Sequence, residues 1–161
     1  MNPFAKGFLE GIIPPPPMTV SEWSDKHRRL SSKGSSEPGP WRTDRTPYLK
    51  EPMNCLSVTN TDVERVVMMF GAQTGKTECG INFLLYTIDH CPAPVLCVAA
   101  SLDMVKRMSR QRLEPAFEET PVIKAKIAPQ RSRDASNSMF IKEYPNGILM
   151  LTGSNSPAGL R

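Results

Sequence analysis

The hydrophobic and polar positions of the chain fall into blocks that predict alternating strands and helices. Residues 66–70, Val-Val-Met-Met-Phe, form a short apolar and β-branched run, a pattern typical of a buried strand. Residues 94–100, Pro-Val-Leu-Cys-Val-Ala-Ala, have the same character and predict a second buried strand, of parallel type. A helix is predicted between them because apolar residues recur there at helical spacing: Ile81, Leu84, Leu85 and Ile88.

A second helix and a hairpin are predicted after the second strand. Ser101 is a good N-cap for a helix, and residues 138–144 and 148–152 predict a β-hairpin with Asn146-Gly147 at its turn. The order strand, loop, helix, strand, helix indicates a right-handed parallel βαβ unit. The fold class expected is therefore α/β, a parallel sheet with flanking helices. The helix after Ser101 is expected to place four residues near one apolar face: Met104, Val105, Met108 and Leu113.

The first 18 residues are interpreted as an arm, separate from a domain that covers residues 19–161. Residues 1–13 have the apolar spacing of a short amphipathic helix. The four prolines at positions 14–17 then form a stiff, extended spacer. Two interpretations of the arm stay open: a segment that docks on another subunit, or a frayed terminus.

A helix start and two aromatic residues precede the first predicted strand. Thr19 and Glu22 have the spacing of a capping box, which opens a helix expected to run to about Leu30. Trp41 is expected to pack against the flank of the strand. Tyr48 either packs there too or presents its ring to an adenine.

The loop that joins the first strand to the first helix carries the candidate chemistry. Residues 71–77 read Gly-Ala-Gln-Thr-Gly-Lys-Thr. Loop amides and the positive N-terminus of the helix attract phosphate oxygens. Lys76 can reach the outer phosphates of a nucleotide, and the Thr77 hydroxyl can ligate Mg²⁺.

The glycine spacing of this loop departs from the general phosphate-binding pattern. Phe70 stands where the pattern places its first glycine, and the glycine comes one position later, at Gly71. A turn that only caps a helix is the alternative interpretation. The strand predicted before the loop and the helix predicted after it favour nucleotide binding, so we interpret the loop as a variant P-loop.

Composition limits the other function classes. The chain has 161 residues and a net charge of +4, a mild basic excess that fits either a polyanionic partner or solvated faces. The apolar stretch 8–13 is interrupted by Glu10 and is too short for a signal peptide or a membrane span. Reduced, structural thiols of a cytoplasmic protein are expected at four positions: Cys55, Cys79, Cys91 and Cys97.

A P-loop ATPase also needs an apolar strand that ends in a carboxylate pair for Mg²⁺ and the attacking water. Asp89, Asp103 and Asp134 do not end apolar runs, and residues 118–119, Glu-Glu, come at a helix end. We therefore expect the chain to stop just before that strand and to be a fragment. Its incomplete sheet is expected to have aggregation-prone edges.

The chain resembles the lambda-like GpA family of phage terminase large subunits. Residues 71–78 match the Ala-Gln-x-Gly-Lys-[Ser/Thr]-Glu core of that family, which accounts for the displaced glycine. The resemblance extends over about residues 19–161. Its other matching stretches, in chain order, are Ser-Glu-Trp at 21–23, Pro-Gly-Pro-Trp-Arg at 38–42, Pro-Tyr-Leu-Lys-Glu-Pro at 47–52, the strand at 95–100, Arg-Leu-Glu-Pro at 112–115 and Gly-Ser-Asn-Ser-Pro-Ala-Gly-Leu-Arg at 153–161.

The resemblance implies part of a viral DNA-packaging motor with a P-loop (RecA-like) fold. In that family an ATPase domain drives double-stranded DNA through the portal into the procapsid, and a C-terminal nuclease cuts concatemeric DNA. The implied partners are viral DNA, a terminase small subunit, the portal and procapsid, and further copies in a ring. The implied location is the host cytoplasm. The second acidic motif and the nuclease domain are expected to lie outside this chain, which would bind nucleotide at most.

The resemblance also assigns site residues. ATP phosphates would lie on the loop, with Lys76 neutralising the transferring charge and Thr77 holding Mg²⁺. Tyr48 would lie near the adenine, and Arg161 would act across a ring interface. The complete nucleotide-site set is Gly71, Ala72, Gln73, Thr74, Gly75, Lys76, Thr77, Glu78 and Tyr48.

Two alternatives to a terminase ATPase segment remain open. A helicase or other translocase of the related P-loop class would share the phosphate-binding loop, although the Ala-Gln loop and the Ser-Pro-Ala-Gly-Leu-Arg stretch favour terminase. A non-catalytic remnant would act as a binding module, through its first 17 residues.

Overall fold

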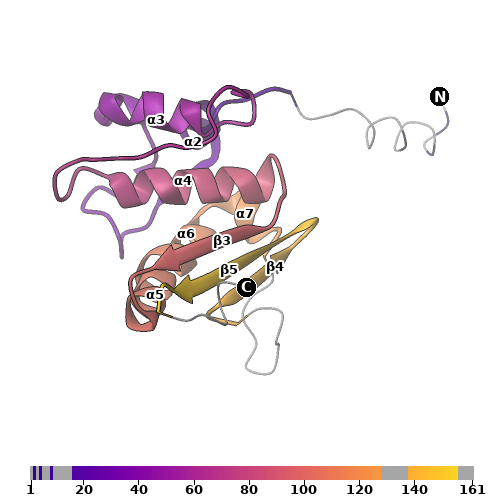
Figure 1. The fold of residues 1–161 in the computed structure, drawn as a ribbon. Helices are drawn as coiled ribbons and strands as arrows, with labels where there is room; N and C mark the ends of the chain where they lie inside the picture. The colour runs from indigo at the N-terminus through magenta and orange to yellow at the C-terminus, as the bar shows by residue number, and fades with distance from the viewer. Residues whose placement is uncertain (1, 3, 5–7, 9–15, 128–137, 156–161) are drawn as a thin grey trace.

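The computed structural model describes residues 2, 4, 8, 16–127 and 138–155. Its central element is the helix α4 (Lys76–Asp89). Two helices, α2 (Val20–His27) and α3 (Lys50–Cys55), lie on one side of α4, and a three-stranded sheet lies on the other side (Figure 1). None of the helices in these residues combines the length and apolar character needed to cross a bilayer.

The helix α2 begins where the capping box predicts. Glu22 N donates to Thr19 Oγ1, and Thr19 N donates to Glu22 Oε2 at 2.8 Å, so two amides at the helix start are satisfied. The helix ends at His27, not near Leu30 as expected, because the backbone of Arg28 is extended. The next two residues instead form β1 (Arg29–Leu30), which pairs antiparallel with β2 (Gly39–Pro40).

Two short 3₁₀ turns lead from this small sheet to α3. They are η1 (Thr43–Arg45) and η2 (Pro47–Leu49), and η2 runs directly into α3. Trp41 is buried, and its indole nitrogen donates to Thr43 Oγ1 at 3.1 Å. Trp41 is therefore a packing residue as predicted, but it does not flank the predicted strand, because residues 66–70 form no strand.

The sheet has the strand order β3–β5–β4. The strand β3 (Val95–Ala99) runs parallel to β5 (Gly147–Gly153), which pairs antiparallel with β4 (Ile141–Tyr144). The predicted hairpin is confirmed. Asn146 has φ of 63° at its turn, a left-handed conformation that asparagine tolerates well. The parallel pairing of β3 is also as predicted, but alternate β3 residues, Leu96 and Val98, are exposed, so the strand is not buried on both faces.

A long helical stretch follows β3, and it changes from α-helical to π-helical and back to α-helical geometry. It consists of α5 (Leu102–Met108), the π-helical turn η3 (Ser109–Leu113) and α6 (Glu114–Glu119), and the short α7 (Pro121–Lys124) comes after it. Ser101 caps α5 as predicted, by accepting from the amide of Met104. Val105 and Leu113 are buried as expected, but Met104 is exposed, because it lies about 100° around α5 from the buried Val105.

Residues 66–70 do not form the strand that their apolar character predicts. They have no regular secondary structure and are not part of the sheet. The side chains of Val67 and Met69 are 73% and 90% exposed. A strand needs a neighbour to satisfy its backbone groups, and within the described residues β3 has only β5 beside it. The predicted βαβ unit is therefore represented by its helix and its second strand only.

Candidate nucleotide-binding site

The residue between the loop and α4 is Gly75, whose backbone conformation favours glycine. Gly75 is the N-cap, with φ of 83°. A Cβ atom on Gly75 would lie 2.9 Å from Leu49 Cδ1, which is too close for two carbon atoms. Gly75 is thus required both by its left-handed backbone and by the packing of η2 against the loop.

The N-terminus of α4 offers backbone donors to an anion. No side chain caps it, and the amides of a first helical turn have no partner within the helix. The partial positive charge of the helix end adds to these donors. Thr77 is exposed in this first turn and lines the hollow beside the loop.

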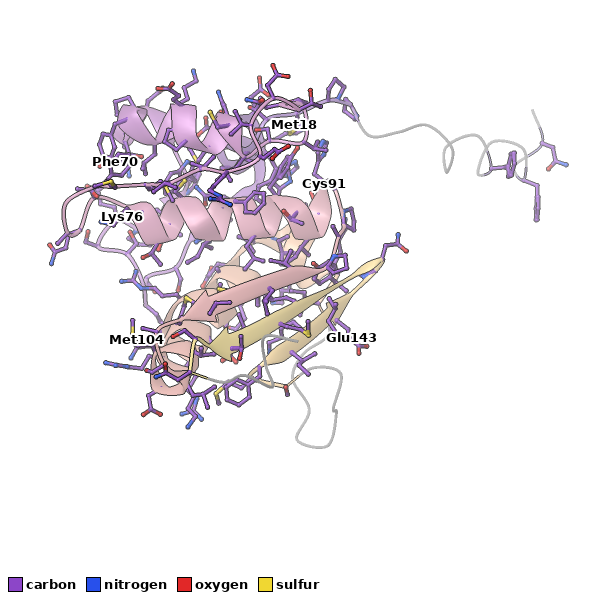
Figure 2. The ribbon with its side chains drawn as sticks, in the orientation of Figure 1. Met18, Phe70, Lys76, Cys91, Met104 and Glu143 are labelled. Carbon is purple, nitrogen blue, oxygen red and sulfur yellow. The ribbon has the colours of Figure 1, made fainter. Side chains whose placement is uncertain are left out.

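The Lys76 side chain stabilises the loop by donating hydrogen bonds to backbone carbonyls of the loop. Its Nζ donates to the carbonyl of Phe70 at 3.0 Å and to the carbonyl of Gly71. The Thr74 hydroxyl donates to the same Gly71 carbonyl at 2.9 Å. Phe70 and Lys76 therefore lie together at one end of α4, as Figure 2 shows. In this structure, the contacts of the ammonium group that the described residues show are therefore with carbonyl oxygens of its own loop.

A polar hollow of 410 Å³ lies beside the loop, within the range of about 300–1,000 Å³ that holds small ligands. Three segments contribute its walls: the loop with the first turn of α4, the stretch that connects β1 to β2, and the π-helical turn. Its lining residues are Gly34, Ser35, Ser36, Gln73, Thr74, Gly75, Lys76, Thr77, Glu78 and Arg112. The loop residues and the helix end thus face a space large enough for a phosphate chain.

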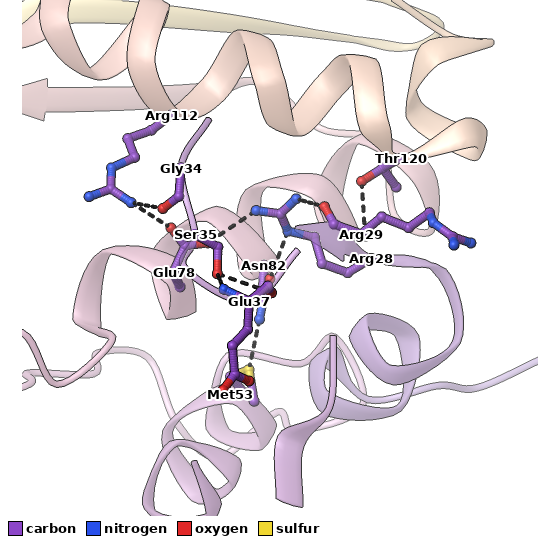
Figure 3. Close-up of polar contacts among 10 residues, drawn as sticks. All are labelled: Arg28, Arg29, Gly34, Ser35, Glu37, Met53, Glu78, Asn82, Arg112 and Thr120. Carbon is purple, nitrogen blue, oxygen red and sulfur yellow. Dashed lines mark hydrogen bonds and ion pairs between the residues drawn. The ribbon is translucent and has the colours of Figure 1, made fainter. Parts of the chain in front are cut away.

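Two arginines share the carboxylate of Glu78 at the back of this hollow (Figure 3). Arg28 Nη2 lies 3.1 Å from Glu78 Oε2, and Arg112 Nη1 lies 3.4 Å from Glu78 Oε1. The Arg28 side chain is 3% exposed and also donates to Asn82 Oδ1. Burial lowers the pKa of Arg28, and the charge of Glu78 opposes that shift. The network fixes the first turn of α4 against α2.

Another carboxylate lies at the opposite end of α4. Asp89 accepts from Trp23 Nε1 at 2.7 Å and pairs with Lys126 Nζ at 2.8 Å. Burial acts to raise the pKa of Asp89, but the hydrogen bonds from Lys126 and Trp23, together with the positive charges of Lys126 and His27, outweigh burial and lower the pKa. Because α4 has 14 residues, Asp89 is about 20 Å from Lys76 along the helix. Its role in this structure is to anchor α2 and the residues that follow α7.

Comparisons with known proteins identify the family. A family model described as the phage terminase large subunit gpA, ATPase domain, matches residues 35–161. The large terminase subunit of Enterobacteria phage P21 is 28% identical over 147 residues, which cover 89% of this chain. The chain belongs to the gpA family of phage terminase large subunits. The predicted resemblance is thereby confirmed.

The gpA family match covers an ATPase domain, and the mixed α/β fold with a partly parallel sheet agrees with it. The chain spans 22% of the length of the P21 large subunit. No solved structure matches the chain.

The positions of the predicted site residues fall into three groups. The loop residues and Glu78 lie together at the start of α4. Tyr48 lies next to Phe70, with ring centroids 6.0 Å apart at 89°, but it does not line the polar hollow. Arg161 lies outside the described residues. The nucleotide-site assignments themselves remain predictions for this member of the gpA family.

Sequence reasoning did not single out the far wall of the hollow. Arg112 lines the hollow, and Arg28, which does not line it, lies behind Glu78; both arginines contact the Glu78 carboxylate. They are 50 and 34 residues away from it in the chain, so no local spacing links them. The sequence feature that could have pointed to Arg112 was the Arg-Leu-Glu-Pro stretch at 112–115, which matched the gpA pattern.

Proposed function

We propose that this chain is the ATP-binding part of a viral DNA-packaging motor. The observation that carries the proposal is the uncapped N-terminus of α4, with Lys76 and a polar hollow beside it, in a chain of the gpA ATPase family. We assign a P-loop fold of the RecA type to the complete domain, which the helix after the loop and the parallel pairing of β3 with β5 support. The complete large subunit would use ATP hydrolysis to drive double-stranded DNA into a procapsid, and it would cut concatemeric DNA with a nuclease domain.

In this proposal the phosphates of ATP lie on the amides of residues 71–77. Lys76 leaves the carbonyls of Phe70 and Gly71 and binds the outer phosphates, while Thr77 ligates Mg²⁺. The donor set supports this assignment, because amides, an ammonium group and a hydroxyl suit a magnesium-bound polyphosphate. Tyr48 is proposed to contact the adenine.

The proposed partners follow from the gpA family. They are viral DNA, a terminase small subunit, the portal and procapsid, and other copies of the large subunit in a ring, all in the host cytoplasm. Arg161 is proposed to act on ATP across the ring interface. These assignments concern the whole large subunit.

The test is Mg²⁺-dependent ATP binding to the 161-residue chain, with Lys76→Ala as the site variant. A lost hydrogen bond to a charged group costs about 1.5–3 kcal/mol, so we expect Lys76→Ala to bind ATP roughly 10- to 100-fold more weakly. Calorimetry or fluorescence with a labelled nucleotide would measure the change. We expect no ATP turnover from this chain.

Lys124→Ala is the matched control, because Lys124 is exposed in α7 and does not line the hollow. It should bind ATP like the unmodified chain. Far-ultraviolet circular dichroism on each sample shows that the variants are folded. Equal ATP affinity of folded Lys76→Ala and the unmodified chain would refute the proposed site.

A further inference from the structure

Arg112 adds a cationic side chain to the lining of the polar hollow, from a segment other than the loop. It comes from the π-helical turn η3, far from the loop in sequence, and it lines the same space as Lys76 and Thr77. Its Nη1 donates to the carbonyl of Gly34 at 2.8 Å, and Figure 3 shows the guanidinium group beside Gly34 and Glu78. A second positive group thus faces the space in which we place the phosphates.

The helix is wound differently where it presents Arg112. Ser109–Leu113 is a π-helical turn between two α-helical stretches, a rare feature that is frequent at functional sites. The turn is anchored on its inner side: Ser109 is fully buried, and its hydroxyl donates to the carbonyl of Met139 at 3.1 Å. The extra residue of this turn changes the direction in which the next side chains project, and Arg112 is one of them.

The contacts that Arg112 makes within the chain are weak enough to be replaced by contacts with a ligand. Its side chain is 45% exposed, and its distance to Glu78 is a long 3.4 Å. Both of its hydrogen bonds among the described residues use the same nitrogen, Nη1. Glu78 does not depend on Arg112 for neutralisation, because the buried Arg28 pairs with its other oxygen.

We propose that Arg112 is a phosphate-binding residue of the nucleotide site, which turns from Glu78 to the polyphosphate when the nucleotide binds. This inference rests on the proposed function of the same site. The planar guanidinium group matches phosphate oxygens with two parallel hydrogen bonds. Lys76 and Arg112 then hold the phosphate chain from two separate segments, and Arg28 keeps Glu78 neutralised while Arg112 is engaged.

The experiment measures the affinity of the 161-residue chain for inorganic tripolyphosphate and for MgATP. Tripolyphosphate has no base or sugar, so it reports on the phosphate contacts alone. We expect Arg112→Ala to weaken both ligands about 10- to 100-fold, as for a hydrogen bond to a charged group. Arg112→Lys should restore part of the loss, because it keeps the charge and loses the planar fork. The salt dependence of tripolyphosphate binding should also fall in Arg112→Ala.

Arg110→Ala is the control, because Arg110 is an exposed arginine of the same π-helical turn that does not line the hollow. It should bind both ligands like the unmodified chain. If Lys76→Ala loses binding while folded Arg112→Ala and Arg112→Lys behave like Arg110→Ala, the role of Arg112 is refuted and the nucleotide site stands. If neither ligand binds the folded, unmodified chain, both proposals are overturned.

Discussion

The two sides of α4 are covered in different ways. On the side that faces α2 and α3, aromatic and aliphatic side chains are fully buried, and polar atoms meet partners: Trp23 donates to Asp89, and Tyr86 Oη donates to the carbonyl of Met18 at 2.9 Å. On the side that faces β3, a mainly apolar hollow of 410 Å³ lies between Leu84 of the helix and Leu96 of the strand.

The difference shows which contacts specify the position of α4. Directional hydrogen bonds at residues 82, 86 and 89 hold it to α2 and its neighbours in a single arrangement. On the side that faces β3, the aliphatic side chains of the helix and of the strand are separated by the apolar hollow. The Leu96 side chain is 45% exposed. We therefore expect substitutions on the α2 side to cost far more stability than those at the edge strand β3.

Trp23→Ala should have the largest effect on stability. Trp23 is 1% exposed and packs edge-on against Tyr86, and removing a buried aromatic side chain typically costs about 3–5 kcal/mol. Urea unfolding followed by circular dichroism would measure the loss. Trp23→Phe, which keeps most of the packing and removes only the donor to Asp89, should lose much less. Equal losses in the two variants would mean that the indole hydrogen bond, and not packing, dominates this side.

Asp89→Asn should have an intermediate effect that depends on pH. Its hydrogen bonds to Trp23 and Lys126 favour the charged form, so we expect a loss of about 1–3 kcal/mol at pH 7. The folded-state pKa of Asp89 is lowered. Its contribution is therefore complete above the unfolded pKa of about 4, and it disappears as pH falls through the folded pKa. The difference in urea midpoint between Asp89→Asn and the unmodified chain should narrow below about pH 4. A gap that stays constant down to pH 2 would contradict this assignment.

Leu96→Ala should have the smallest effect, because the side chain is half-exposed at the edge of the sheet. Exposed substitutions usually change stability by about 0.5 kcal/mol or less. The matched control is Leu149→Ala in the central strand β5, where the side chain is completely buried and the expected loss is about 2–5 kcal/mol. Similar unfolding midpoints for the two variants would show that the edge strand is as well packed as the centre, and a loss in Leu96→Ala as large as that in Trp23→Ala would contradict the contrast between the two sides of α4.

Local patterns predicted much of the fold correctly. The capping box at Thr19, the helical spacing in α4, the N-cap at Ser101 and the Asn-Gly turn each depend on residues within a few positions of one another. Physical rules for such short spacings therefore apply before any tertiary contact is known.

The sequence-based predictions were wrong where contacts between residues far apart in the chain decide the conformation. Residues 66–70 are apolar enough for a strand but have no neighbouring strand in the described part of the chain. The early end of α2 follows the burial of Arg28 against Glu78, a residue 50 positions away. In the candidate site, the loop was found from its motif, whereas the wall that includes Arg112 depends on a π-helical turn that no spacing rule indicated.

The contact between Gly75 and Leu49 also limits how this sequence can evolve. A side chain at position 75 would meet Leu49 Cδ1 at 2.9 Å, so a replacement of the glycine requires the end of the Leu49 side chain to move or to become smaller. Even then the backbone at φ of 83° would disfavour most side chains. The backbone conformation and this contact therefore both favour glycine at position 75, and a substitution there should be tolerated better when position 49, 26 residues earlier in the chain, has a smaller side chain.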